Sequence, residues 1–70
     1  MGRLSGRLAW WSRWEREQRG LTQQEIAAAS GVSVRRVRAI EAGRSNATLD
    51  TVEAIADAMG VDPLELLKAR

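Results

Sequence analysis

Several residue types on which folding and chemistry often depend are missing from this chain of 70 residues, which has no cysteine and no histidine. The absence of cysteine excludes disulfide bonds and thiolate zinc sites, and the absence of histidine removes the commonest general base and metal ligand. A membrane-spanning helix needs about 20 apolar residues, and no run here approaches that length. The apolar run from Leu8 to Trp11 is also too short for the core of a signal peptide. We therefore expect a soluble, intracellular chain without a metal or a cofactor.

The charge is distributed unevenly along the chain. Residues 1–44 hold nine arginines and four glutamates, whereas residues 45–70 hold two basic and five acidic residues. The net charge of +2 thus combines a basic region of +5 with an acidic region of −3. Three of the arginines, Arg35, Arg36 and Arg38, lie within four positions. A basic region of this kind indicates a polyanionic partner, although basic side chains also serve simply to solubilise one face.

Residues that end helices and residues that begin them alternate along the chain. Thr22 and Glu25 have the spacing of a capping box, and Ser33 and Thr48 can each cap a following segment. Asp62 precedes the only proline and predicts a further helix start. Glycines, which often end helices, follow four stretches with helical spacing: Gly20, Gly31, Gly43 and Gly60. The pattern predicts an all-α fold of one domain and five helices, over residues 3–18, 23–30, 34–42, 49–59 and 63–69.

Segment 34–42 has two different faces when its residues are placed at about 100° intervals. Val37 and Ile40 share one face, and Arg36 lies on the flank. Long basic and small side chains occupy the opposite face: Arg35, Arg38, Ala39 and Ala42. The major groove of duplex DNA admits a helix, and an arginine in it can make two hydrogen bonds to guanine. This face therefore suits an approach to DNA.

The stretch LTQQEIAAASGVSVRRVRAIEAG, residues 21–43, satisfies the packing constraints of a helix-turn-helix. Ala27 is small where two helices cross closely, and Gly31 stands in the turn, where a positive φ is needed. The buried contacts come from Ile26, Val32, Val37 and Ile40. This stretch resembles the helix-turn-helix of the phage repressor and Cro family, and the likeness continues through EAGRSNATLDTVEAIADAMGVDPLELL. It implies a compact, five-helix, lambda-repressor-like domain, with the motif at about residues 22–42 in its second and third helices.

The resemblance also implies roles for individual residues. Arg16 and Glu41 match a pair that forms an internal salt bridge in relatives. At the position before Arg16, where relatives carry an apolar residue, this chain has Glu15. The positions that read base edges are matched by Ser33, Val34, Arg35, Arg38 and Ala39. Gln23 matches a glutamine that bonds to a backbone phosphate, and Arg44, Ser45 and Asn46 match a loop that follows the DNA backbone. Arg36 lies on the flank of its helix, where we expect it to meet a phosphate of the DNA backbone or an acidic side chain.

The first predicted helix holds all three tryptophans. Leu4, Leu8, Trp11 and Trp14 recur at helical spacing, which predicts that Trp11 and Trp14 belong to the core. Trp10 lies at the edge of this stripe. It can serve either as a lid over a small core or as an anchor for a protein partner.

The resemblance implies a sequence-specific regulator of transcription that binds double-stranded DNA. It would be encoded by a bacterium or a phage and located in the cytoplasm, on the nucleoid. Two copies on a pseudo-palindromic operator would form a homodimer, with Leu66 and Leu67 of the last helix as the contact surface. The alternative is a protein-interaction module, such as an antitoxin or adaptor, that uses the tryptophan-rich helix. We do not expect an enzyme, because Lys68 is the only lysine and no nucleophile stands beside a base.

Overall fold

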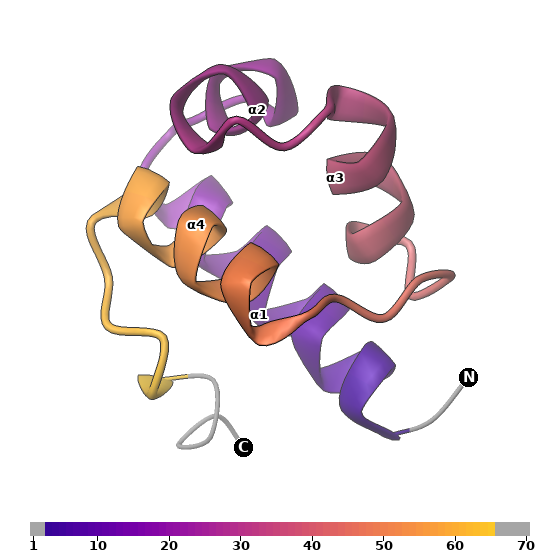
Figure 1. Ribbon diagram of the computed structural model, residues 1–70. Helices are drawn as coiled ribbons and strands as arrows, with labels where there is room; N and C mark the ends of the chain where they lie inside the picture. The colour runs from indigo at the N-terminus through magenta and orange to yellow at the C-terminus, as the bar shows by residue number, and fades with distance from the viewer. Residues whose placement is uncertain (1–2, 66–70) are drawn as a thin grey trace.

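The computed structural model describes residues 3–65, with side chains from Gly6 onward, and these residues form four α-helices and no strand. The helices are α1 (Arg3–Gln18), α2 (Gln23–Ser30), α3 (Val34–Glu41) and α4 (Leu49–Met59), as Figure 1 shows. The predicted all-α fold is confirmed, and the bounds of α1, α2 and α4 agree with the prediction. None of the helices in the described range is long and apolar enough to cross a membrane.

The apolar core lies where all four helices meet. Helix α2 packs against α3 and α4, and α1 packs behind them against the same two helices (Figure 1). Each helix contributes residues to one cluster, made of Leu8, Trp11, Ile26, Val37, Ile40, Val52, Ile55, Ala56 and Met59. Burying a single isoleucine or valine side chain contributes about 1.5–3 kcal/mol, so this cluster supplies most of the stability of so small a chain.

The predicted helix starts at Thr22, Ser33 and Thr48 are confirmed. The hydroxyl of Thr22 accepts from the Glu25 N–H at 3.0 Å, and the Thr22 N–H donates to the Glu25 carboxylate at 2.8 Å, which completes a capping box. Ser33 caps α3 through the N–H of Arg36 at 3.1 Å, and Thr48 caps α4 in the same way. These bonds satisfy N–H groups that would otherwise have no acceptor at a helix start.

Helix α3 is one residue shorter than predicted and ends at Glu41. The N–H of Gly43 donates to the carbonyl of Ile40, and the N–H of Arg44 donates to that of Ala39, both at 3.0 Å. This pair of bonds needs a left-handed residue at position 43, and Gly43 has φ 75°. The chain therefore leaves the helix in a Schellman motif, and Ala42 becomes the capping residue.

The predicted fifth helix is not found in the described residues, which contain four helices and not five. The carboxylate of Asp62 accepts from the Leu64 N–H, and the Asp62 carbonyl accepts from the Glu65 N–H, each at 2.9 Å. An aspartate that accepts from the second N–H after it is a normal helix N-cap, and Glu65 is already helical, so the described residues include the start predicted for this helix but not the helix itself. Residues 66–69 of the predicted helix, including Leu66 and Leu67, lie outside the described residues.

The prediction for the tryptophans is right for Trp11 and wrong for Trp14. Trp11 is 1% exposed in the core, whereas Trp14 is 43% exposed. The inner side of α1 is completed instead by two polar residues, Ser12 and Glu15, which are both buried. Glu15 occupies the position where relatives carry an apolar residue, and Arg19, one turn later, donates to its carboxylate and its carbonyl. Because Glu15 holds that inward position, Trp14 remains on the outer side.

Candidate nucleic-acid interface

Helix α3 presents one apolar face to the core and one basic face to solvent. Val37 and Ile40 are 0% exposed, whereas Arg35 and Arg38 are exposed. Ala39 and Val34 are half-buried between these two faces. The predicted orientation of the helix is confirmed, so the residues matched to base reading border one outward surface.

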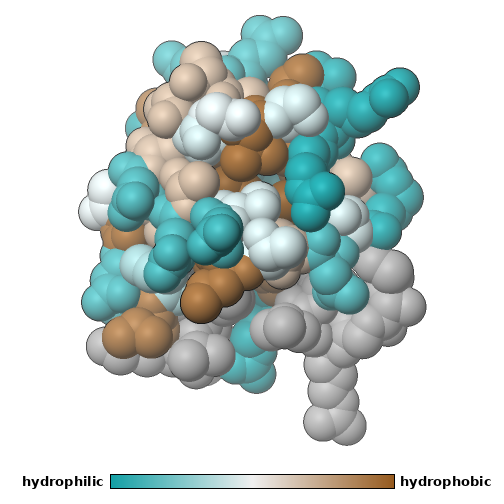
Figure 2. Space-filling model, viewed as in Figure 1, coloured by the Kyte–Doolittle hydropathy of each residue, from teal (hydrophilic) through white to brown (hydrophobic). Residues whose placement is uncertain are grey.

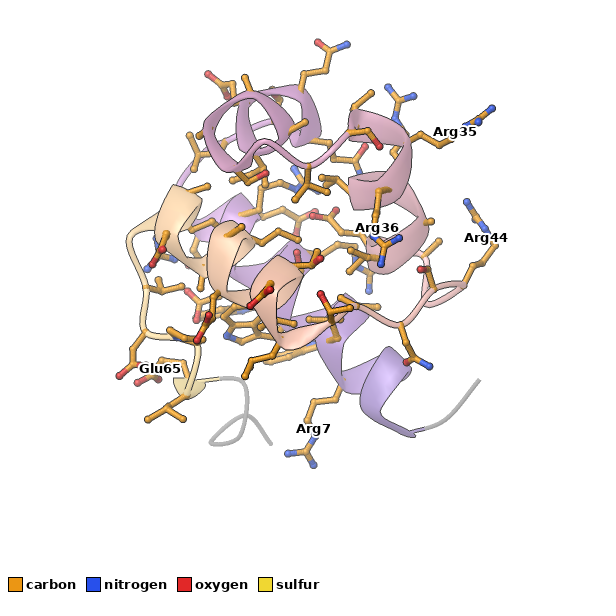
Figure 3. The ribbon with its side chains drawn as sticks, viewed as in Figure 1. Arg7, Arg35, Arg36, Arg44 and Glu65 are labelled. Carbon is orange, nitrogen blue, oxygen red and sulfur yellow. The ribbon has the colours of Figure 1, made fainter. Side chains whose placement is uncertain are left out.

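Arg35 and Arg38 are the free cations of this surface. Across the described residues, no hydrogen bond or ion pair engages either guanidinium group. Figure 3 shows Arg35 extending away from the body of the molecule. An arginine carries five N–H donors in a rigid fork, so two such groups without internal partners can bind an external acceptor.

Arg36 lies on the flank of α3 and contacts the loop that follows the helix. One of its terminal nitrogens donates to the carbonyl of Asn46 at 3.3 Å, and the hydroxyl of Ser45 donates to the same carbonyl at 3.1 Å. Arg36 is exposed, so most of its donors still face solvent. It therefore ties the loop to the helix and remains able to meet a phosphate.

The loop after α3 adds a further cation. Arg44 is exposed, and its N–H bond to Ala39 fixes its backbone against the end of α3. Arg44 and Arg35 project on the same side of the molecule in Figure 3, and Figure 2 shows hydrophilic side chains along that side. The cations of α3 and of the loop thus form one basic surface.

A buried carboxylate anchors the end of α3. Glu41 is 3% exposed, and Arg16 on α1 grips it with two nitrogens, each 2.9 Å from a different carboxylate oxygen. The Ser12 hydroxyl donates to it at 3.3 Å, and the side-chain amide of Gln23 donates at 3.0 Å. The predicted salt bridge between Arg16 and Glu41 is confirmed. Side chains from α1 and α2 therefore converge on the last residue of α3.

This network holds Arg16 in its charged form. Its hydrogen bonds to Glu41 raise the pKa of the Arg16 guanidinium above its ordinary value, and partial burial opposes them. A third nitrogen of Arg16 donates to the carbonyl of Leu21 at 2.9 Å. Removing one member of a buried ion pair leaves the other charge uncompensated, which makes such pairs costly to break.

The structure gives Gln23 a contact that the sequence did not predict. The resemblance implied a bond from Gln23 to phosphate, whereas its amide nitrogen bonds to Glu41. Ser12 was also missed as a member of the network. The available signal for Ser12 was its place one helical turn before Arg16, on the inner side of α1.

The described residues contain no group of three or more side chains that could hold a metal ion. A shallow surface pocket is lined by Trp10, Arg13, Trp14 and Glu17, all on α1. It belongs to the outer side of α1 and shares no residue with the basic surface. The arrangement of α3 and the loop therefore offers cationic donors on a rigid helix, which is suited to binding a polyanion.

Comparisons with known proteins agree with this geometry. A family model described as Helix-turn-helix matches residues 13–66. The chain is 42% identical over 52 residues to an uncharacterized HTH-type transcriptional regulator, y4dJ, of Sinorhizobium fredii, a match that covers 74% of this chain and 68% of that protein. The chain is also 36% identical over 53 residues to the HTH-type transcriptional regulator DdrOP3 of Deinococcus deserti. This match covers 76% of this chain and 41% of that protein. No solved structure matches the chain at the level of significance that these two relatives reach.

Proposed function

The chain belongs to the Cro/C1-type helix-turn-helix family of DNA-binding transcriptional regulators, which are not enzymes, and we propose that it recognises a specific operator by placing α3 in the major groove. In this proposal residues 1–70 form one DNA-binding domain, whose motif spans about residues 22–42. The residues that approach base edges are Ser33, Val34, Arg35, Arg38 and Ala39.

The observation that carries the proposal is the state of Arg35 and Arg38. Both are exposed, and neither guanidinium is engaged elsewhere in the described residues. The helix that bears them is held from behind by Val37 and Ile40 and at its end by the Glu41 network. Free donors on a firmly held helix lose little conformational freedom beyond their own side chains when they bind bases.

Val34 and Ala39 complement the arginines in this proposal. Both are apolar and half-buried, so each offers a small surface suited to contact with a thymine methyl group rather than to a hydrogen bond. Ser33 already accepts the N–H of Arg36 through its hydroxyl oxygen, which leaves the hydroxyl hydrogen for a base edge or a phosphate.

Phosphate contacts would fix the position of α3 along the groove. The proposed residues lie at the start of α2, on the flank of α3 and in the loop after it, and they are Gln23, Arg36, Arg44, Ser45 and Asn46. The amide nitrogen of Gln23 carries two hydrogens, and one of them is used for Glu41. The second can bind a phosphate, so the internal contact and the proposed external one are compatible.

A single α3 reads only a few base pairs, so operator binding by two copies follows from the geometry of DNA. Half-sites on one face of the duplex are separated by one helical turn of about 34 Å, which a homodimer can span. We propose that the copies act together on a pseudo-palindrome in the cytoplasm, on the nucleoid, and regulate transcription from there.

Selection of bound duplexes from a random pool tests the proposal directly and should yield a short preferred site. Arg35→Ala should then lose about 1–3 kcal/mol on that site, and much less on a scrambled duplex, because a bidentate contact to guanine is lost. The matched control is Arg7→Ala, which removes one exposed arginine from α1 outside the basic surface and should weaken both duplexes equally and slightly. If Arg35→Ala lowers affinity for both duplexes by one common factor, base reading by Arg35 is wrong.

A further inference from the structure

The outer side of α1 exposes two large aromatic side chains that neither the core nor the basic surface uses. Trp10 is 38% exposed and Trp14 is 43% exposed. Their rings are stacked, with centroids 5.9 Å apart and planes inclined by 13°. Arg13 and Glu17 complete the shallow pocket beside them. These four residues are called the α1 aromatic surface below.

The α1 aromatic surface is turned away from the rest of the molecule. Leu8 and Trp11 point from the opposite side of α1 into the core, and α1 packs against α3 and α4 through that inner side. Contiguous aromatic groups in solvent are uncommon on a small monomer and mark contact sites. The stacked pair is therefore a candidate contact site for a partner.

We propose that the α1 aromatic surface binds the same surface of a second copy of this chain, with the two α1 helices antiparallel. The inference rests on the proposed function, since two half-sites require two copies, and it names the surface that joins them. It differs from the sequence-based expectation, which placed this contact on Leu66 and Leu67, outside the described residues.

The charges of the α1 aromatic surface favour a second copy of the chain as its binding partner. A two-fold interface brings each patch against itself, so the patch must complement its own charges. This one carries a single cation, Arg13, and a single anion, Glu17, beside an apolar pair. In an antiparallel crossing Arg13 of each copy comes near Glu17 and the Trp14 ring of the other. Such a contact combines an ion pair with a cation–π interaction.

Such a dimer leaves the DNA-binding residues free. The α1 aromatic surface shares no residue with the basic surface, and α3 packs on the inner side of α1. An interface centred on four residues of one helix is small, so we expect a weak dimer in solution. Two adjacent half-sites hold the copies at a high effective concentration, which makes a weak contact sufficient on DNA.

Self-association without DNA tests the proposal, measured on the full chain by sedimentation equilibrium. The wild-type chain should dimerise, and Arg13→Glu or Glu17→Arg should each weaken the dimer about tenfold or more, because both symmetry-related pairs become repulsive. The double variant, which restores opposite charges and the net charge, should recover most of the affinity. Glu53→Arg, an exposed reversal on α4, is the control and should change little. A wild-type chain that stays monomeric up to about millimolar concentration would overturn the proposal, as would a dimer that these variants do not affect.

A second measurement connects the dimer to DNA. The ratio of affinity for two half-sites to affinity for one should fall in each single reversal and recover in the double variant. Removing an arginine weakens the general electrostatic attraction to DNA of both kinds of site, and this loss cancels in the ratio. Failure of the double variant to recover, in either measurement, would refute the proposed pairing of Arg13 with Glu17 across the dimer. Absence of any preferred DNA site would instead refute the proposed function, and the association data without DNA would still decide the dimer.

Discussion

Replacing Glu41 by glutamine would keep the shape of the side chain but remove the charge that faces Arg16. The carboxylate is 2% exposed and the Arg16 side chain 14% exposed, with 2.9 Å between the bonded atoms. Breaking a buried ion pair by removing one partner costs about 3–5 kcal/mol, and the low end of this range applies because Arg16 is only partly buried. A chain of this length has about 4–10 kcal/mol of total stability. We therefore expect Glu41→Gln to lower the melting temperature by more than about 10 °C, and to leave part of the population unfolded at room temperature.

Thermal unfolding followed by circular dichroism measures this effect. Glu53→Gln removes an exposed carboxylate from α4 and is the matched control, with an expected change within about 0.5 kcal/mol. Replacing both partners, as Glu41→Leu with Arg16→Met, should recover part of the loss, because no buried charge then remains uncompensated. A melting temperature of Glu41→Gln within about 3 °C of the wild type would refute the view that this carboxylate holds α3 in place.

The loss of unfolding free energy in Glu41→Gln should be the same at neutral and mildly alkaline pH, because Arg16 stays charged in this range. The hydrogen bonds to Glu41 raise the pKa of Arg16 in the folded state. A group whose folded pKa is raised contributes stability that is complete below its unfolded pKa and is lost only as the pH rises through the folded value. Both values lie far above neutrality, so unfolding at about pH 7 and about pH 9 should give the same contribution from this group.

Two further predictions separate binding from stability. Affinity for the operator should fall steeply with salt concentration, and Arg36→Ala should weaken binding to all sequences equally. The variant should also reduce the slope of log affinity against log salt concentration by about one unit per lost phosphate contact in each subunit. A binding titration at several salt concentrations measures this slope, and an unchanged slope would contradict the phosphate role. Ile40→Ala should lower the free energy of unfolding by about 2–5 kcal/mol, because Ile40 is 0% exposed. Arg38→Ala should leave thermal unfolding nearly unchanged. If the Arg38 variant melts at a clearly lower temperature, Arg38 supports the fold.

The helices and their starts could be predicted because their signals are local. Thr22 and Glu25 are three residues apart and bond to each other, so their spacing in the sequence already describes the contact. The orientation of α3 was predictable for the same reason, since Val37 and Ile40 occupy one side of any helix that contains both. Gly43 was expected to follow a helix, but the exact length of α3 depended on which carbonyls its turn would use.

The contacts that were missed involve residues far apart in the sequence. Gln23 and Glu41 are 18 residues apart, and Ser12 and Glu41 are 29 apart, so no local pattern predicts that they meet. Trp14 was misplaced for a related reason: its spacing from Trp11 fits one stripe, but the tertiary packing chose Glu15 for the inner side. A buried glutamate contradicts the usual preference for apolar residues, and its ion pair with Arg19 offsets the cost of burying the charge.

The placement of the one acidic residue of α3 explains how a helix with both signs of charge can face DNA. Glu41 points inward, where Arg16 neutralises it, while Arg35, Arg36 and Arg38 are exposed. An exposed carboxylate at the same helix end would repel phosphates over about 8–10 Å, the distance across which salt screens charges at physiological strength. Because the neutralising arginine comes from α1, the basic surface keeps its three cations of α3 unopposed. The contact between Glu41 and Arg16 therefore has two effects: it fixes the end of α3, and it removes a negative charge from the surface proposed to approach DNA.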